Sequence, residues 1–396
     1  MSKPTLLMLN MSHQFDWDKG IVNRNYHVLN ALIHSGEYEK VISVDFFPFT
    51  FKKRIKMILK GKLWKRNTTT VYKKWHTRVD TDPTNGSVYR VTSLSEKHLP
   101  QMLQRLNIDT TNFVLWSYNP LAIDLMAIYK NAFVVFDAVD NWTEHPSYTS
   151  VTDRLQENYK TIAKRADIIF TVSEGLIDFF GKKQKVMYVP NGVDAEHFVT
   201  GTCNPSLLGK KSLDTSKKTV GYHGIIQSRV NLSVFDYLAK KFPEMNFVIA
   251  GPVWKEMQTE MKELQQLPNV YTPGPVPYAQ LPSLLHCFDV TVIPHKVDAF
   301  TQSMNPLKIY EYLASGKPII STAVAGADQF QDLIKLAVSP EDFAEKIVKA
   351  IETDTTELIS RRQEMAKQHN WSTRVQLMLD LMTTSQEEHD DDHGKN

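Results

Sequence analysis

Residues 303–318 read SMNPLKIYEYLASGKP, and this stretch decides how the second half of the chain is interpreted. Asn305 is a good N-cap residue, and Pro306 suits the first position of a helix. Gly316 suits the left-handed turn that ends a helix, and the proline two residues later prevents continuation. The pattern therefore predicts a helix from about Pro306 to Ser315.

Two charged side chains share one face of this expected helix. Lys308 falls in the first turn, where partial positive charge makes a lysine unfavourable by roughly 0.3–1 kcal/mol. A bound anion reverses the sign, because the ammonium and the free N–H groups then share one phosphate. Glu311, one turn later, is placed to accept hydrogen bonds from ribose hydroxyls. The helix therefore favours a nucleotide-diphosphate site. The alternative is an ordinary βα unit in which a solvated Lys308 pairs with Glu311.

The composition predicts a two-domain, water-soluble protein. The chain has 396 residues, and 42% of them are hydrophobic, which suits two globular domains. Its two cysteines, Cys203 and Cys287, match no metal-binding spacing. We therefore expect a reducing compartment and no disulfide framework. The apolar run near the N-terminus is too short for a signal peptide or a membrane span.

Positive charge gathers in one segment. Residues 52–78 contain eleven Lys or Arg and no Asp or Glu, and apolar residues recur among them at helical spacing near Trp64. A basic amphipathic stretch of this kind can lie on an anionic membrane surface. The alternatives are a solvated or packed basic face, or a nucleic-acid contact, for which no accompanying motif is present. We expect the anionic membrane surface to be the partner of residues 51–78, and no nucleic-acid partner.

Strands alternate with helices through most of the chain, which predicts parallel sheets in an α/β protein. The sequence restarts this pattern after a polar stretch at residues 200–218, which we interpret as an interdomain linker. We expect one domain over residues 1–199 and a second over 200–370. A helix over 371–385 would cross back to the first domain, followed by a disordered acidic tail at 386–396.

Four stretches together resemble one enzyme class. They are residues 305–318, the YVPNGVD segment at 188–194, the ADIIFTVS strand at 166–173 and the GYHG turn at 221–224. In this order the chain resembles glycosyltransferases of the GT-B type, which have two Rossmann-like, doubly wound parallel-sheet domains facing a cleft. It is most similar to bacterial group 1 enzymes that build surface polysaccharides of the teichuronic-acid or capsule kind.

The sequence departs from the common family pattern at two places. Retaining members usually carry a second Glu eight residues before the ribose-binding one, where this chain has Ser303. They also tend to have an Arg directly after the glycine turn, where this chain has Ile225, and the nearest cation is Arg229. These departures leave retention versus inversion open.

The resemblance implies a donor site in the second domain for a nucleotide-diphosphate sugar of the UDP or GDP type. It implies no metal, so Lys308 and Arg229 would neutralise the leaving diphosphate. Open parallel sheets bind ligands at the carboxyl ends of their strands. The expected donor-binding residues are Gly224, Arg229, Gly251, Val276, Tyr278, Asn305, Pro306, Leu307, Lys308 and Glu311. For Tyr278, a proline-stiffened turn without ligand contact is the alternative.

The first domain is expected to hold the acceptor. Titratable side chains follow two of its predicted strands, and a general base on the acceptor hydroxyl is needed for an inverting transfer. The candidates for this role are Asp137, Asp140 and His13, although Asp137 can equally cap a helix or pair with Arg24. The expected acceptor or phosphate-loop residues are Trp17, Gly20 and Trp142, whereas Trp116 suits the core.

These features predict a hexosyltransferase that moves a sugar from a nucleotide sugar to a lipid-linked or growing polysaccharide in cell-surface glycan synthesis. We expect it in the cytoplasm, peripheral on the inner face of the membrane. One alternative is a degenerate GT-B subunit that supports a partner enzyme, suggested by Ser303 and Ile225. The other is a non-hydrolysing nucleotide-sugar 2-epimerase, which has the same fold.

Overall fold

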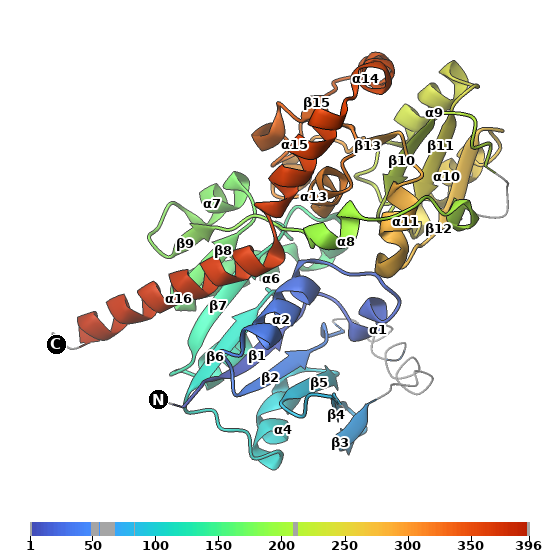
Figure 1. Cartoon of the computed structure of the whole chain (residues 1–396). Coiled ribbons are helices and arrows are strands. Elements are labelled where there is room, and N and C mark those ends of the chain that lie inside the picture. Colours follow the sequence, from blue (N-terminus) through green and yellow to red (C-terminus); the bar gives the residue numbers. More distant parts are fainter. Residues whose placement is uncertain (1, 49–54, 56–67, 83, 209–212, 394–396) are drawn as a thin grey trace. The chain divides into compact units, whose positions relative to one another are not determined.

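The computed structural model describes residues 2–48, 55, 68–82, 84–208 and 213–393. The chain divides into two compact units, each built around one sheet (Figure 1). The first unit comprises Met1–Thr171, Leu176–Val189 and Val375–Asn396. The second comprises Val172–Gly175 and Pro190–Arg374. No described helix is both long enough and apolar enough to cross a membrane.

The first unit contains a sheet with nine strands among its described residues, in the order β3-β4-β5-β2-β1-β6-β7-β8-β9. All neighbours are parallel except β3–β4 and β4–β5. Strand β1 is buried along its whole length, as expected of a central parallel strand covered on both faces. The strands are β1 (Thr5–Leu9), β2 (Lys40–Val44), β3 (Thr69–Lys74), β4 (Thr77–Thr81), β5 (Val88–Ser93), β6 (Phe113–Ser117), β7 (Phe133–Ala138), β8 (Ile168–Thr171) and β9 (Val186–Tyr188).

Helices connect these strands, and the amphipathic ones turn one apolar face to the sheet. In α6, for example, Leu155, Tyr159 and Ile162 are buried. The helices are α1 (Gln14–Trp17), α2 (Arg24–Ser35), η1 (Glu96–His98), α4 (Leu99–Arg105), α5 (Asp124–Ile128), η2 (Pro146–Val151), α6 (Thr152–Arg165) and α7 (Glu174–Phe180).

The second unit contains a fully parallel sheet in the order β12-β11-β10-β13-β14-β15. This is the order of a doubly wound nucleotide-binding sheet, in which the strand order reverses between the first and fourth strands. Here those strands are β10 and β13. The strands are β10 (Thr219–His223), β11 (Asn246–Ala250), β12 (Val270–Gly274), β13 (Val290–Ile293), β14 (Ile319–Ser321) and β15 (Ile334–Leu336).

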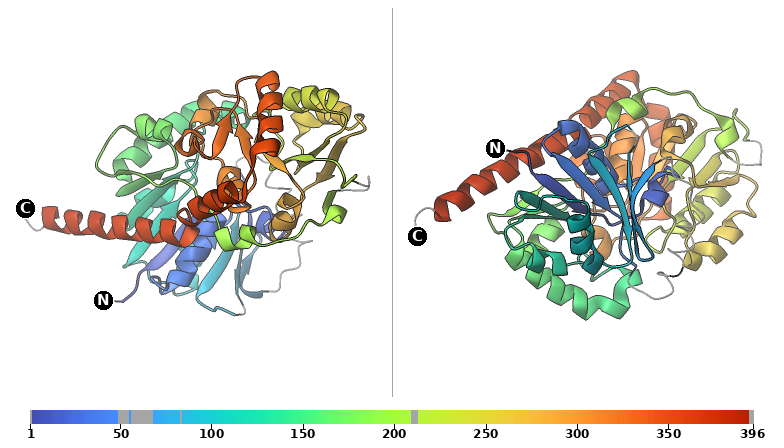
Figure 2. Two further views of the ribbon diagram at one scale, coloured as in Figure 1. Left: turned by 45° about the horizontal axis from the view of Figure 1, so that its top comes forward. Right: turned by 90° about the horizontal axis from the view of Figure 1, so that it is seen from below.

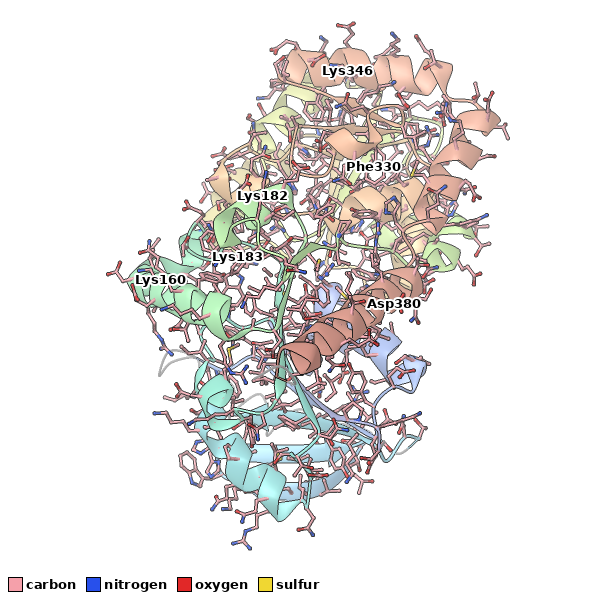
Figure 3. The ribbon with its side chains drawn as sticks, turned by 90° about the vertical axis from the view of Figure 1, so that its left-hand side faces the viewer. Lys160, Lys182, Lys183, Phe330, Lys346 and Asp380 are labelled. Atoms are coloured by element: carbon pink, nitrogen blue, oxygen red, sulfur yellow. A yellow bond between two sulfur atoms is a disulfide. The ribbon has the colours of Figure 1, made fainter. Side chains whose placement is uncertain are left out.

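Two apolar clusters form the core of the second unit. One contains Phe288, Tyr310 and Phe330, and the other contains Phe235, Phe247 and Ile347. Figure 3 labels Phe330 within this unit. The helices are α8 (Ala195–Val199), η3 (Pro205–Leu208), α9 (Leu232–Lys241), η4 (Lys255–Met257), α10 (Gln258–Leu264), η5 (Tyr278–Gln280), α11 (Leu281–Leu285), α12 (Ala299–Gln302), α13 (Leu307–Ala314), η6 (Asp328–Phe330), α14 (Pro340–Thr353) and α15 (Thr356–Lys367).

The fold agrees with the predicted pair of Rossmann-like domains, but the passage between them differs from the expected linker. The chain enters the second unit at Pro190. The described parts of the polar stretch, residues 200–208 and 213–218, belong to the second unit, and Leu208 is buried in its core. The last helix, α16 (Trp371–His393), starts in the second unit and continues in the first (Figure 2). It runs past residue 385, into the segment that we expected to be disordered, where Gln386 and Glu387 favour a helix.

The expectation of two unpaired cysteines is wrong. Cys203 and Cys287 form a disulfide across a sequence separation of 84 residues. The segment after α8 folds back along α11, where the Asn204 amide donates to the Ser283 carbonyl at 3.3 Å. This return brings the two cysteines together, and their spacing in the sequence does not predict that they pair.

Candidate functional site

Three glycines lie at the carboxyl ends of adjacent strands in the second unit. Gly224 follows β10, Gly251 follows β11, and Gly274 ends β12. Gly224 and Gly251 have φ values of 135° and 143°, which side-chain-bearing residues rarely adopt. A Cβ on Gly251 would lie 1.9 Å from the Gly224 carbonyl oxygen. The two glycines therefore let two loops approach each other over the sheet edge.

Lys308 lies at this edge, in the first turn of α13, and its side chain is buried. A Cβ on Gly224 would lie 3.1 Å from Lys308 Cε, so the glycine leaves room for the lysine. The ammonium lies 5.2 Å from the centre of the Tyr222 ring. The solvated Lys308 of the alternative interpretation is therefore wrong, since this side chain is only 7% exposed.

The surroundings of Lys308 disfavour the charged form of its amine. Burial, and secondly the charge of Arg229, lower the pKa of Lys308 to about 7, while Glu311 opposes the shift. Burial, Lys308 and Arg229 also hold the pKa of His295 well below its usual range. Positive potential therefore accumulates at this edge, which makes it a candidate anion site.

Arg229 and His295 are held by neighbouring polar groups. With the Gln227 amide in the orientation that satisfies both residues, its oxygen accepts from Arg229 Nε at 3.1 Å and Nη1 at 2.8 Å. His295 Nε2 lies 3.4 Å from the Tyr222 hydroxyl. Arg229 is only partly buried, so its guanidinium can also reach a ligand.

Glu311 lies one turn after Lys308 and is paired with a histidine. Its Oε2 lies 3.0 Å from His223 Nε2, and both side chains are largely buried. The His223 backbone N–H donates to the Tyr312 hydroxyl at 3.0 Å. This contact fixes the end of β10 against α13. The Glu311 carboxylate, which we expected to contact a ribose, is therefore held in place by His223.

The start of α13 is fixed by side chains from distant segments. Asn305 does not cap the helix as expected. Pro306 occupies the N-cap position, and the Asn305 oxygen accepts from the Asn191 backbone N–H at 2.9 Å. The Ser173 hydroxyl donates to the Ser303 carbonyl at 2.9 Å. Asn305 therefore ties the start of α13 to the turn at residues 190–192. At the other end of the helix, the predicted left-handed conformation of Gly316 is confirmed, with a φ of 71°.

The remaining donor candidates lie around this edge. Leu307 is partly exposed at the first position of α13. Val276 and Tyr278 follow β12 and pack partly against the core. The Tyr278 ring stacks on His197, with 4.5 Å between ring centroids and an interplanar angle of 16°. This packing occupies one face of Tyr278, which favours the stiffened-turn alternative for this residue.

In the first unit, Asp137 is a structural residue rather than an accessible base. It is fully buried in β7 and accepts from Arg24 Nε at 3.0 Å through both oxygens. Burial raises the pKa of Asp137, and the Arg24 guanidinium opposes this shift. The pairing with Arg24, which the sequence left open, is therefore the arrangement observed.

Asp140 and His13 remain candidates, because both side chains are partly exposed. Asp140 lies just beyond β7, and its carbonyl accepts from the Tyr159 hydroxyl at 3.5 Å. His13 precedes α1 and meets the Phe46 ring edge-on at 6.2 Å. Each belongs to a loop at a strand's carboxyl end, as an acceptor-binding residue should.

The aromatic acceptor candidates are more buried than expected. Trp142 is 4% exposed and stacks on Tyr148 with ring centroids 4.6 Å apart. Trp17 is 7% exposed, and its indole N–H donates to the Ser12 hydroxyl at 2.9 Å. Gly20 has φ 77° and ends the turn after α1. Trp116 lies in the core, as expected.

Two histidines of the candidate site, His223 and His295, were not expected from the sequence. Both lie just at or beyond the carboxyl end of a parallel strand, on either side of the point where strand order reverses. That position was the available signal. Among the described residues, no cluster of His, Cys, Asp or Glu could hold a metal ion.

This arrangement of two doubly wound units, with its charged edge in the second, is the GT-B fold of glycosyltransferases. Residues 217–353 match the family model of glycosyl transferases group 1 and include the glycine edge and α13. TuaH of Bacillus subtilis (strain 168), named as a glycosyltransferase of teichuronic acid biosynthesis, is 28% identical over 262 residues. The match covers 61% of this chain and spans 64% of TuaH.

Solved structures agree over nearly the whole chain. Anabaena HepE, solved with UDP and glucose, is 17% identical with a TM-score of 0.66, covering 96% of this chain and 99% of HepE. A variant of S. aureus TarM, solved with UDP among its ligands, is 13% identical with a TM-score of 0.62. The match covers 96% of this chain and 100% of TarM. At these identities the likeness establishes the fold.

The glycine edge yields a first prediction. Gly251→Ala should destabilise the second unit, since a positive φ alone costs roughly 1–2 kcal/mol for other residues and the new methyl would meet the Gly224 carbonyl. Gly86→Ala is the control, because a Cβ there meets nothing within 4 Å. Thermal unfolding of both variants measures the difference. Equal melting temperatures would contradict the close approach.

Proposed function

We propose that this protein is a glycosyltransferase that moves a sugar from a nucleoside-diphosphate sugar, of the uridine type, to a glycan acceptor in cell-surface polysaccharide synthesis. The observation that carries the proposal is the buried Lys308 beside Gly224, at the sheet edge where strand order reverses. The name of TuaH supports the surface-glycan class. The UDP complexes of HepE and TarM support the uridine donor.

The proposed reaction depends on stabilising the negative charge of the leaving diphosphate. Glycosyl transfer leaves a diphosphate with growing negative charge, and fixed cations in a dry site stabilise that charge. Lys308, the α13 N-terminus and Arg229 supply them, which makes a metal unnecessary in this proposal. Glu311, anchored by His223, would accept from the ribose hydroxyls. In the first unit, Asp140 or His13 would take the proton of the acceptor hydroxyl.

A donor-binding experiment tests the assignment. Lys308→Ala should weaken UDP binding roughly tenfold to a hundredfold, the value of one charge-assisted contact, and leave uridine binding nearly unchanged. Glu311→Gln should weaken both ligands. Lys262→Ala, at an exposed lysine of α10, is the matched control. Calorimetric titration gives the affinities, and equal UDP affinity for wild type and Lys308→Ala would refute the site.

Activity is measured as UDP release from UDP-sugars with and without a lipid-linked glycan acceptor. Release that requires the acceptor supports transfer. Epimerised nucleotide sugar formed without an acceptor would favour the 2-epimerase instead, and UDP binding with no turnover on any acceptor would favour a non-catalytic subunit.

The pKa of Lys308 predicts how donor binding depends on pH. The free protein holds this pKa at about 7, and a bound diphosphate favours the charged amine and raises it. UDP affinity should therefore be highest below pH 7 and fall as pH rises towards 9, with proton uptake on binding. Titration in two buffers of different ionisation enthalpy counts the proton. Lys308→Met should remove the uptake. A flat profile in the wild type would contradict the shifted pKa.

We further propose that the first unit works at an anionic membrane surface. Residues 51–54 and 56–67 of the expected basic stretch lie outside the described residues. In the described part, Ile55 is 45% exposed, and Trp75 is 80% exposed at the tip of the β3–β4 hairpin. Lys73 and Lys74, the last two residues of β3, directly precede the tip and are exposed. A tryptophan beside lysines suits the lipid headgroup region.

This proposal predicts lipid-dependent binding. Vesicles with anionic lipid should bind the protein, and neutral vesicles should bind it less. Changing Lys73 and Lys74 to Gln should weaken binding roughly thirtyfold, at about 1 kcal/mol per cation. Lys160→Gln is the control, because Lys160, labelled in Figure 3, already pairs with Glu157 at 2.7 Å. Sedimentation with vesicles measures the effect. Equal binding to both vesicle types at low salt would refute the proposal.

A further inference from the structure

The Cys203–Cys287 disulfide ties an exposed segment of the second unit to the end of helix α11. Cys203 lies on the segment that follows α8 and is exposed, whereas Cys287 lies just beyond α11 and is only 9% exposed. Thiol–disulfide exchange needs access for the attacking thiolate, and exposed disulfides are the labile ones. A reductant can therefore approach this bond from the Cys203 side.

Two weaker contacts support the disulfide in holding this segment, residues 201–206, which are all exposed. The Asn204 backbone N–H donates to the Ser283 carbonyl at 3.3 Å. Gly201 lies close to the His286 ring, since a Cβ on this glycine would lie 2.6 Å from His286 Cδ2. The disulfide is the covalent restraint among these contacts, so its cleavage would loosen the segment from α11.

The structure accommodates the reduced cysteines as well as the disulfide. Cys287 Sγ lies 3.3 Å from the Ser283 carbonyl oxygen, which can accept a hydrogen bond from a free thiol. Cys287 also belongs to an apolar cluster of the second unit, where a thiol packs as a small hydrophobic group. The Cys203 thiol would lie at the surface. Reduction therefore leaves neither sulfur in an unfavourable environment.

Both ends of the disulfide lead to the loop that follows β12. On one side, α8 supplies His197, whose ring stacks on Tyr278 and whose Nε2 lies 3.0 Å from the Tyr278 carbonyl oxygen. On the other side, α11 begins directly after η5, the turn that starts at Tyr278. Val276, an expected donor residue in this loop, packs against the same core. Release of residues 201–206 would loosen the supports of this loop.

Helix α8 also packs against α13, the helix that carries Lys308 (Figure 1). Phe198 of α8 is fully buried in the same apolar cluster as Ile309 and Tyr310 of α13. Contiguous packing of this kind can carry energetic coupling between two sites. The restraint on α8 is therefore connected to the helix on which the donor edge depends.

We propose that the Cys203–Cys287 disulfide is a redox-sensitive site that dithiols cleave, and that its reduction weakens nucleotide binding at the donor edge. The effect on nucleotide binding rests on the proposed donor site, whereas the cleavage does not. Disulfides in reducing compartments are usually transient or redox-sensing. The proposal therefore reconciles this bond with the reducing compartment that we expected.

The exchange proceeds in two steps. A thiolate of the dithiol attacks the Cys203 sulfur, and the S–S bond breaks with its electron pair leaving on the Cys287 sulfur. The second thiol of the reductant then attacks the sulfur that the reductant has bound to Cys203, which releases Cys203 and closes the disulfide of the reductant. Two electrons pass to the protein, and the two protons of the dithiol end on the two cysteines.

Thiol counting and calorimetry on the full chain test the proposal. The chain has two cysteines, so maleimide labelling reports on this bond alone. We expect no labelled thiol in the oxidised protein and two after incubation with dithiothreitol in the absence of denaturant. Reduction should weaken UDP binding roughly threefold to thirtyfold and speed hydrogen exchange in residues 201–206 and 276–281. Cys203→Ser should bind UDP as the reduced wild type does and should not respond to dithiothreitol.

Thermodynamic linkage supplies an independent check. If the oxidised protein binds UDP more tightly, saturating UDP must shift the ratio of reduced to oxidised dithiothreitol at half-reduction by the same factor. Ser206→Ala is the matched control, because it changes the same exposed segment and leaves the disulfide intact, so it should respond as the wild type does.

Two kinds of failure are distinguished. The proposal is overturned if the oxidised protein has free thiols, if reduction requires denaturant, or if oxidised and reduced protein bind UDP equally. Absence of UDP binding by the oxidised protein would refute the donor site, and with it the effect on nucleotide binding. The thiol count would still show in that case whether dithiols cleave the bond in the native protein.

Discussion

The burial of Lys308 without a neutralising partner is the constraint on which the second unit depends. Among the described residues, no carboxylate lies within ion-pair distance of its ammonium, and Arg229 adds charge of the same sign. A pKa lowered from 10.5 to about 7 corresponds to a cost on the order of 5 kcal/mol for charging the amine. That cost exceeds the roughly 0.3–1 kcal/mol of a helix-terminus interaction. Much of that cost is recoverable if an anion binds, which is the physical basis for proposing Lys308 as a binding residue.

Several features of the unit follow from keeping that lysine in place. Gly224 has a φ of 135°, which residues with side chains rarely adopt, and a Cβ there would crowd Lys308 Cε at 3.1 Å. Gly251 must lack a side chain because the Gly224 backbone lies against it. Asn191 and Ser173 hold the entry to α13 through two hydrogen bonds to residues 303–305. Glu311 is turned towards His223 instead of towards the lysine. Had Glu311 paired with Lys308, the site would be neutral and would offer an anion little.

The sequence was sufficient for the architecture and for the place of Lys308 in the first turn of a helix, because helix signals and strand periodicity are local features of the sequence. It was insufficient wherever a contact joins distant segments. The expected capping role of Asn305 was wrong, because its oxygen instead accepts from the backbone N–H of Asn191, which lies 114 residues away in the sequence. The Cys203–Cys287 disulfide depends on a segment folding back over α11. His223 and His295 were overlooked because a lone histidine has no periodicity, and only the strand order shows that both flank the reversal point.

The two units treat the equivalent edge of their sheets in opposite ways. In the second unit, a buried cation is left to be neutralised by a ligand. In the first, Asp137 ends its strand in the same manner, yet Arg24 neutralises it inside the fold. Removing one partner of such a pair typically costs 3–5 kcal/mol, so Asp137 is committed to stability and is not available to move a proton. The two remaining proposed bases, Asp140 and His13, lie in the loops beyond the strands and are partly exposed. A strand-end carboxylate is a reactive candidate only when no buried arginine faces it.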